Sequence, residues 1–297
     1  MPRRFFSALV VATILVSCGT GDDAASVNEV AVRTSDLEQT ISDFAAVGEI
    51  QIVNGVADGE TVRGLLTSLI RAEVTKQVLA AANEAITETD RDAIAQQFAE
   101  QGTTDIPDTL RDLIIELNAA NAVLGRVQAP SAEEVAERYA KNPKSLGMLC
   151  VRHLVVKTEA IARQARAKLS ATPTDEEFAK VAGEYSDEPD ADKSGGALVG
   201  QTSDCIGINE WQAGFDPDFV AGALGARTGV PTQPVKTSFG WHVIYIRPFT
   251  AVAESVSNNL AESPGEFLLL GALADADISV ASRYGRWDPL AGSVVAP

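Results

Sequence analysis

Two short runs with strand-like alternation constrain the fold most, because they hold both histidines of the chain. The first run, residues 151–157, includes His153, and the second, residues 237–246, includes His242. Successive side chains of a strand point to opposite faces, so each histidine shares a face with aliphatic neighbours. The pattern predicts that both imidazoles point into the same protein interior.

The segment between these runs predicts helices on either side of an acidic, glycine-rich stretch. One helix is expected at residues 159–169, and Thr174 with Glu177 forms a capping box for the next, which would bury Phe178. A third, short helix is expected at residues 216–224. Helices that flank a small antiparallel sheet define an α+β fold class.

In this order the motifs resemble those of the parvulin-type peptidyl-prolyl cis/trans isomerases. That family combines an R-H-[IL]-L-V-K strand, two helices, Y-S-D-[DE], G-G-D-L-G, a phenylalanine-bearing helix, P-V-K-T and F-G-[WY]-H-I-I. Between residues 152 and 244 the chain has R-H-L-V-V-K, Y-S-D-E, G-G-A-L-V-G, P-V-K-T and F-G-W-H-V-I. The resemblance implies a parvulin-like isomerase domain at residues 148–248.

The same resemblance assigns roles position by position. It implies a proline pocket formed by Phe215 and Phe219, a histidine pair beneath it (His153 and His242), a hydroxyl in their hydrogen-bonded network (Thr237) and an acidic residue beside the substrate carbonyl (Glu188). Each residue also has a plainer explanation. The aromatic and imidazole rings could simply fill a core, and the carboxylate could belong to a solvated acidic loop.

Two departures from the family pattern bear on catalysis. The stretch from Glu188 to Gly196 is one residue longer than usual, so Asp187 or Asp190 could take the acidic position. The G-G-D-L-G motif also lacks its aspartate, because Ala197 stands there.

The chemistry implied by the resemblance needs no nucleophile, metal or cofactor. Rotation about an X-Pro bond has a barrier of roughly 20 kcal/mol, because the twisted amide loses its resonance. An apolar pocket for the proline ring and polar groups placed for the twisted amide would lower it. We expect a peptidyl-prolyl isomerase and folding chaperone. A catalytically weak or inactive parvulin-fold holdase and a purely structural lipoprotein are the alternatives.

The N-terminus predicts export. Two arginines precede an apolar run at residues 5–16, which is too short to span a bilayer and has the layout of a signal peptide over residues 1–17. The following L-V-S-C sequence, ending at Cys18, resembles a bacterial lipobox. It implies a lipidated Cys18, a small polar tether at residues 18–26 and an extracytoplasmic protein anchored to a membrane. An ordinary signal peptide with a chance cysteine is the alternative.

If Cys18 is lipidated, Cys150 and Cys205 are the only remaining thiols, and one pairing is possible. A disulfide is the preferred interpretation, since it would close a loop of about 55 residues, worth about 4 kcal/mol in the chain-entropy model. Two buried free cysteines are the alternative. Their separation does not fit the close pairs of a zinc site.

Length and charge bound the partners. A chain of 297 residues is long enough for two domains, and its formal net charge of −17 disfavours nucleic acid as a partner. The expected partners are unfolded or proline-containing exported polypeptides, together with a membrane through the lipid anchor.

Outside the parvulin-like region, residues 27–142 predict a mostly helical block. This arrangement resembles the chaperone domain of bacterial extracytoplasmic foldases of the SurA and PrsA type, although a bundle that merely positions the isomerase would look the same. The apolar tail, residues 249–297, needs a partner to cover it. We expect it to pack back on the N-terminal block, unless residues 278–287 form an exposed partner-binding strand.

Overall fold

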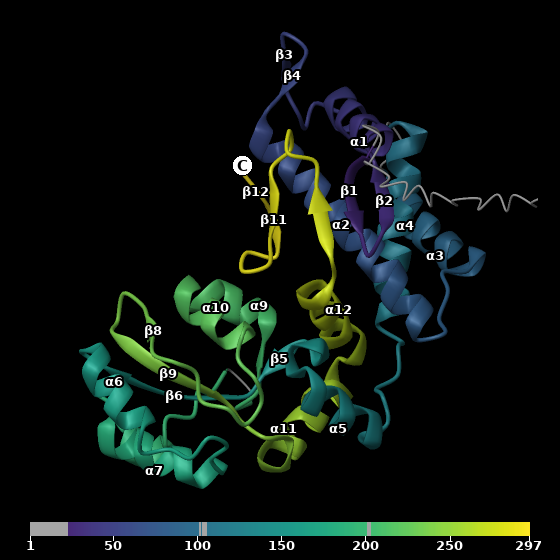
Figure 1. Cartoon of the computed structure of the whole chain (residues 1–297). Coiled ribbons are helices and arrows are strands. Elements are labelled where there is room, and N and C mark those ends of the chain that lie inside the picture. Colours follow the sequence, from purple (N-terminus) through teal and green to yellow (C-terminus); the bar gives the residue numbers. More distant parts are fainter. Residues whose placement is uncertain (1–22, 101, 103–105, 201–202) are drawn as a thin grey trace, which may run out of the picture.

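The computed structural model describes residues 23–100, 102, 106–200 and 203–297. Figure 1 shows these residues arranged in three parts: a terminal unit built from both ends of the chain, a middle domain, and a connecting layer of helices between them. The signal peptide expected at residues 1–17 and the lipidation site, Cys18, lie outside the described residues.

The terminal unit contains a three-stranded antiparallel sheet in which the two ends of the chain meet. Its strands, in spatial order, are β10 (Ile278–Val280), β1 (Asp23–Val27) and β2 (Val30–Arg33). In this sheet Val27 lies opposite Ile278 on one side and Val30 on the other. Residues 23–26, expected as part of the tether, are therefore strand. Ala24 and Ala25 are buried, because they belong to the central strand of this sheet and pack into the core of the terminal unit.

Helices supply most of the core of this unit. The helices are α1 (Thr34–Ala46), α2 (Gly59–Ala81), α3 (Glu88–Glu100) and α4 (Asp108–Leu124), and the remaining strands form two hairpins, β3 (Ile52–Val53) with β4 (Val56–Ala57) and β11 (Arg286–Asp288) with β12 (Ser293–Val295). An apolar stripe of α2, including Leu66 and Ile70, packs in one cluster with Val123 of α4 and Val294 of β12. The C-terminal residues thus complete an N-terminal core.

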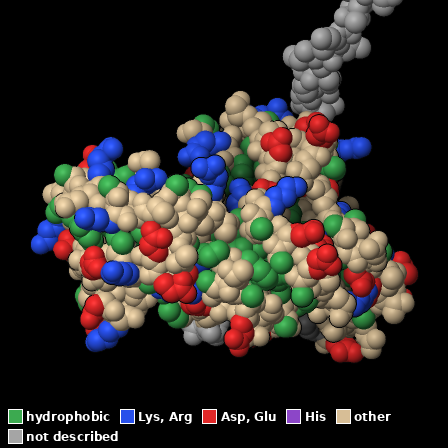
Figure 2. All heavy atoms as spheres, turned by 60° about the horizontal axis from the view of Figure 1, so that its bottom comes forward, with side chains coloured by type: hydrophobic (Ala, Val, Ile, Leu, Met, Phe, Trp, Pro, Cys, Tyr) green, Lys and Arg blue, Asp and Glu red, His purple; other side chains and the backbone are tan. Residues whose placement is uncertain are grey.

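The connecting layer consists of α5 (Ala132–Lys141), the 3₁₀ helix η1 (Pro143–Leu146), α11 (Phe249–Glu262) and α12 (Pro264–Asp275). Helix α12 packs on both α2 and η1. It crosses η1 closely, since a Cβ atom on Gly271 would lie 2.2 Å from the carbonyl oxygen of Ser145. On the face shown in Figure 2, hydrophobic side chains gather in the middle of the molecule, where this layer lies.

The tail divides between two partners. The buried side chains of α11, including Val252 and Val256, lie in the cluster of Tyr139 and Met148, next to the middle domain. Leu273 of α12 joins the core of the terminal unit instead. The whole tail therefore contacts residues 27–142, α11 through α5 and α12 through α2, but α11 also covers the edge of the middle domain.

The middle domain confirms the expected α+β class. Its sheet has the order β6 (Val151–Val156), β9 (Trp241–Ile246), β8 (Val235–Lys236), all antiparallel, and β5 (Met148–Leu149) pairs separately with β7 (Ile206–Gly207). Its helices are α6 (Glu159–Arg166), α7 (Asp175–Tyr185), α8 (Ala191–Ser194), α9 (Ile208–Gly214) and α10 (Pro217–Leu224). The expected cap of α7 forms, with Thr174 accepting a hydrogen bond from the Glu177 backbone.

Pairing of β6 with β9 fixes which face each histidine occupies. His153 lies opposite Ile244, and His242 lies opposite Val155. Residues directly opposite in an antiparallel pair point to the same side, so both imidazoles share one face. Leu154 occupies the other face, where it packs with Phe178 of α7.

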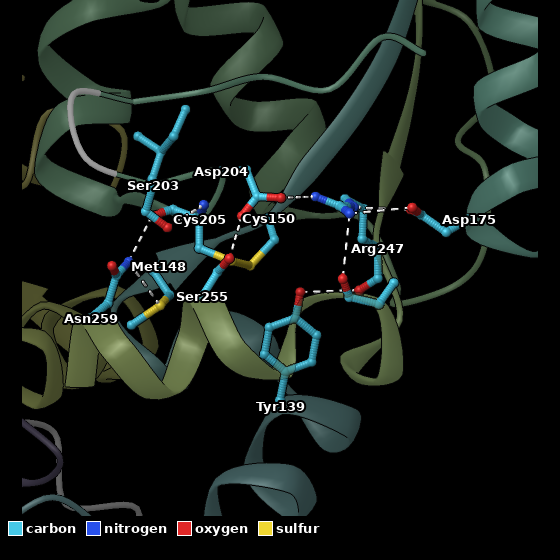
Figure 3. Close-up of a disulfide and its surroundings, with 12 residues drawn as sticks. Tyr139, Met148, Cys150, Asp175, Ser203, Asp204, Cys205, Arg247, Ser255 and Asn259 are labelled. Atoms are coloured by element: carbon cyan, nitrogen blue, oxygen red, sulfur yellow. Dashed lines mark hydrogen bonds and ion pairs between the residues drawn. A yellow bond between two sulfur atoms is a disulfide. The ribbon is translucent and has the colours of Figure 1, made fainter. Parts of the chain in front are cut away.

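The contact between the middle domain and α11 is organised by a disulfide between Cys150 and Cys205 (Figure 3). The segment that carries Cys205 is held by α11, because Asn259 Nδ2 donates to the Cys205 carbonyl at 2.8 Å and Ser255 Oγ donates to Asp204. We call Cys150, Cys205, their neighbours Asp175, Asp204 and Arg247, and the α11 residues Ser255 and Asn259 the joint.

Arg247 lies at the centre of the joint and is almost completely buried. Its guanidinium donates to Asp175 at 2.9 Å and also pairs with Asp204. Burial alone would raise the pKa of the Asp175 carboxyl, but its ion pairs with Arg152 and Arg247 outweigh burial and lower the pKa. The joint therefore contains charges that are matched with one another.

Candidate active site

The two histidines are in direct contact. His153 Nδ1 and His242 Nδ1 lie 3.1 Å apart, and the imidazole rings stack with an interplanar angle of 14°. On the far side, His242 Nε2 lies 2.8 Å from Thr237 Oγ1. All three side chains are buried. The structure thus brings together three of the four residues expected in the polar network.

The fourth residue, Glu188, meets the other end of this line. Its Oε2 atom lies 3.0 Å from His153 Nε2, although the oxygen is not aligned for a regular hydrogen bond. Of the alternatives, Asp190 pairs with Lys193, whereas Asp187 lines the same cavity as Glu188 and both histidines. Glu188 is the acidic residue whose carboxylate contacts a histidine.

The carboxylate orders the protons of the line when both imidazoles are neutral. Because a carboxylate only accepts, the Glu188 oxygen 3.0 Å away favours the tautomer with the proton on His153 Nε2, and in that tautomer His153 Nδ1 accepts from His242. His242 Nε2 is consequently an acceptor for the Thr237 hydroxyl. One direction of donation thus runs from the threonine to the carboxylate.

Burial and neighbouring charges set the pKa values of this line. Burial, reinforced by His153, lowers the pKa of His242 from 6.5 to about 4. The contact with His153 lowers the pKa of Glu188 below its usual 4.5, against the opposing effect of partial burial. At neutral pH, His242 is uncharged and Glu188 is a carboxylate.

Aromatic rings form the wall above the imidazoles. The ring of Phe219 presents its edge to His153 and His242, with centroids 5.3 and 5.1 Å apart and interplanar angles of 83° and 75°. Phe215 lies farther out, 6.1 Å from Phe219 and 4.2 Å from Trp211. Trp211 was not among the residues expected at the site, although Trp211, Phe215 and Phe219 follow one another at intervals of four residues.

These groups line one cavity of about 450 Å³. His153, Glu188 and His242 contribute its polar wall, and Phe215 and Phe219 its apolar wall. Phe239, from the loop between β8 and β9, also lines the cavity but is 78% exposed. An apolar cavity with a few convergent polar groups has the usual character of a ligand site. Thr237 is not among the lining residues and acts on the site through His242.

The glycine-rich loop packs directly behind the histidine strand despite its altered sequence. The His153 backbone N–H donates to the Gly196 carbonyl at 2.8 Å. Gly196 has a positive φ of 69°, and a Cβ atom there would lie 1.9 Å from the carbonyl oxygen of His153. Only glycine fits this contact, so it persists although Ala197 replaces the family's aspartate.

The site and fold together define a parvulin-type domain. Residues 154–248 match the family model of the PPIC-type peptidyl-prolyl isomerase (rotamase) domain. The match covers the segment that carries the motifs of this family.

Among individual proteins, the chain is similar to foldase protein PrsA. It is 31% identical to PrsA of Clostridium botulinum strain 657 over 166 residues, 52% of this chain and 46% of the relative. It is 36% identical to PrsA of Clostridium kluyveri over 107 residues, 36% of this chain and 28% of the relative. The chain thus spans less than half the length of these curated relatives.

Similarity to solved structures is more distant. The crystal structure of PrsA from Bacillus subtilis is 17% identical and covers 88% of this chain and 95% of that chain, with a TM-score of 0.30. A structure reported for two SurA-like chaperones of Campylobacter jejuni, PEB4 and the periplasmic protein Cj1289, is 21% identical and covers 81% of this chain and 91% of that chain, with a TM-score of 0.29.

Within residues 23–297, apart from the few not described, no helix has the length and apolar character needed to cross a membrane. The same part of the chain has no group of three or more His, Cys, Asp or Glu residues placed to hold a metal ion.

Proposed function

We propose that the protein is a peptidyl-prolyl cis/trans isomerase that assists the folding of exported polypeptides. The observation that carries this proposal is the line from Thr237 through His242 and His153 to Glu188, whose last three members line one cavity together with Phe219. It supplies the two things the reaction uses, an apolar seat for a proline ring and a fixed set of polar groups.

The chemistry follows from the change in charge as the amide twists. A planar amide carries partial negative charge on its oxygen through resonance, and the twisted amide loses much of that charge. A carboxylate beside the oxygen, the place proposed for Glu188, destabilises the planar form more than the twisted one. The apolar surface of Phe219 and Phe215 also favours the less polar twisted state. The barrier falls without a covalent step.

A proline-peptide isomerisation assay on the soluble mature chain, residues 19–297, tests this proposal. Catalysed exchange that falls in Glu188→Gln, while peptide binding persists, would support it. Exchange at the uncatalysed rate in a folded wild-type protein would contradict it. The catalytically inactive holdase would then be the remaining function, which the replacement of the motif's aspartate by Ala197 favours.

For the chaperone role, a second cavity is the supporting observation. It has a volume of about 470 Å³, lies between α2, α5 and α12, and is lined by apolar side chains, such as Leu268, and by charged ones, such as Glu134 and Arg138. A mixed lining of this kind suits a segment of an unfolded chain, which carries both apolar side chains and free backbone polar groups. Suppression of aggregation by the wild type, and its loss in Leu268→Asp at unchanged thermal stability, would support client binding here. Equal suppression by both proteins would contradict it.

We further propose that the isomerase domain is inserted into one chaperone domain formed by residues 27–142 and part of the tail. The pairing of β10 with β1 supports this arrangement. Deleting residues 277–297 should abolish hydrogen-exchange protection in the terminal unit and leave the middle domain protected. Losses confined to residues 148–248 would contradict the insertion.

The L-V-S-C sequence supports a lipid anchor at Cys18 and an extracytoplasmic location. Cys18→Ser should release the protein from the membrane fraction or block its maturation. Unchanged fractionation and unchanged mass would exclude lipidation.

A further inference from the structure

The carboxylate of Asp216 links helix α10 to the loop between β8 and β9, and both of these segments carry residues of the candidate active site. Asp216 Oδ2 accepts hydrogen bonds from Ser238 Oγ at 2.7 Å and from the Ser238 backbone N–H at 3.2 Å. Its other oxygen, Oδ1, accepts from the Asp218 backbone N–H at 3.0 Å, at the start of α10. Asp216 is thus both the N-cap of α10 and a latch on the loop between β8 and β9.

Each side of this latch carries pocket residues. Helix α10 holds Phe219 against the imidazoles. The loop holds Thr237, whose hydroxyl contacts His242, and Phe239, whose backbone N–H donates to Thr237 Oγ1 at 3.1 Å. Ser238 lies between these two residues, so a bond to Ser238 restrains both of them.

Other contacts hold this loop at its ends, where Val235 of β8 also packs against Gly222 of α10. The Thr237 backbone N–H donates to the Gly240 carbonyl at 2.9 Å, and β8 contributes two residues to the sheet. Neither contact reaches across the pocket. Among the described residues, the hydrogen bonds that cross from the tip of the loop to α10 are those that Asp216 accepts from Ser238.

We propose that Asp216 is a positioning residue that fixes the loop carrying Thr237 and Phe239 relative to Phe219. The inference deepens the proposed isomerase function and rests on it. It assigns no contact between Asp216 and substrate. Its effect is to hold the mouth of the pocket, with the exposed ring of Phe239, at a set distance from the proline seat.

The two roles of Asp216 can be separated by side-chain length. Serine is a good N-cap, so Asp216→Ser retains the cap of α10, but its shorter side chain cannot also reach Ser238. Asp216→Asn keeps the side-chain length but has a single acceptor oxygen, which can serve either the Asp218 N–H or Ser238, so its effect should be intermediate. Ser238→Ala removes the hydroxyl from the other side, and Ser238→Thr restores one. Asp218→Asn, an exposed position on the same turn, is the matched control.

The experiment measures kcat and KM for a proline peptide, together with hydrogen exchange at the Ser238 amide. We expect Asp216→Ser and Ser238→Ala to lower kcat/KM about tenfold with unchanged thermal stability, since small displacements of a catalytic wall reduce rates strongly. We expect Ser238→Thr and Asp218→Asn to remain near the wild type and Asp216→Asn to lie between the wild type and Asp216→Ser. The Ser238 amide should exchange faster only in Asp216→Ser.

Wild-type kinetics and wild-type amide exchange in Asp216→Ser would show that Asp216 is only a helix cap and would overturn the proposal. If the wild-type protein has no isomerase activity, the proposed function fails separately. The latch is then judged by Ser238 exchange and proline-peptide affinity across the same variants, and an affinity unchanged in Asp216→Ser overturns it.

Discussion

The joint and the active site differ in how completely their buried polar groups are paired. Cys150 and Arg247 of the joint flank strands β6 and β9, and the same strands carry His153 and His242 of the active site. At the joint, Arg247 contacts two carboxylates, and Asp175 also binds Arg152. At the active site, Glu188 contacts a histidine, and the Nε2 atom it faces has no aligned acceptor. Buried polar groups cost free energy unless they are paired. The buried charges of the joint are all paired, which stabilises the fold. At the active site, His153 Nε2 has no aligned acceptor, so it is available to a substrate.

We therefore expect mutations at the joint to lower the free energy of unfolding and mutations at the active site to lower kcat/KM. The largest expected effect comes from the disulfide. Replacing Cys150 and Cys205 together by Ala should lower the free energy of unfolding by about 4 kcal/mol, because the closed loop no longer restricts the unfolded chain. Denaturant unfolding of the double variant measures the loss.

Thiol labelling is the companion measurement. The folded mature protein should show no free Cys150 or Cys205 thiol until a reductant is added. Ready labelling without reductant would exclude the bond, and a large loss of kcat in the folded double variant would contradict the separation of joint from site.

A smaller loss is expected from Asp175→Ala, which leaves Arg152 and Arg247 without their shared carboxylate. Truncating one partner of a buried ion pair costs about 3 kcal/mol, since an unmatched charge stays buried. The control is Asp190→Asn, which tolerates the positive φ of 59° at this position and removes an exposed pair with Lys193 that should contribute less than about 1 kcal/mol. Equal effects of the two substitutions in thermal unfolding would show that the joint is not a buried charge network.

The sequence was most informative where local pattern and chemistry coincide. Alternation placed His153 and His242 on one face, because strand periodicity needs no knowledge of the rest of the chain. The sequence did not show that α11 would contact the middle domain as well as α5, since the helical face of Val252 and Val256 does not specify which apolar surfaces will cover it. The sequence also did not indicate the ion-pair partners of Arg247. Asp175 lies 72 positions away, and nothing local marks either residue.

Local signals also misled in two places. Ser35 and Glu38 match a capping box, yet α1 begins at Thr34 with no side-chain cap, and Ser35 donates to Asp36. Small residues near the N-terminus suggested a tether, but Ala24 and Ala25 belong to a strand that needs β10 as its neighbour. In both cases the decisive contact comes from elsewhere in the fold.

On the site's side of the comparison, Phe219→Leu should lower kcat/KM about tenfold, corresponding to about 1.4 kcal/mol of transition-state stabilisation. Leucine keeps most of the buried volume, so stability should change by less than about 1.5 kcal/mol. Phe178→Leu, on the opposite face of the sheet, is the matched control and should leave kinetics unchanged. The comparison fails if both variants lose stability and activity in parallel.

The smallest effect is expected from moderate acidification. His242 should titrate near pH 4 instead of 6.5, because burial and His153 disfavour its charged form. The unfolded state then binds more protons between these pH values, so stability rises with pH across that window and falls as pH drops from 6.5 toward 4. Activity should change less than about twofold between pH 7.5 and 6, since His242 is neutral throughout. With only two histidines in the chain, NMR can follow each imidazole directly. A His242 midpoint near 6.5, together with an activity step at that pH, would show that the histidine pair is open to solvent and titrates as an ordinary surface group.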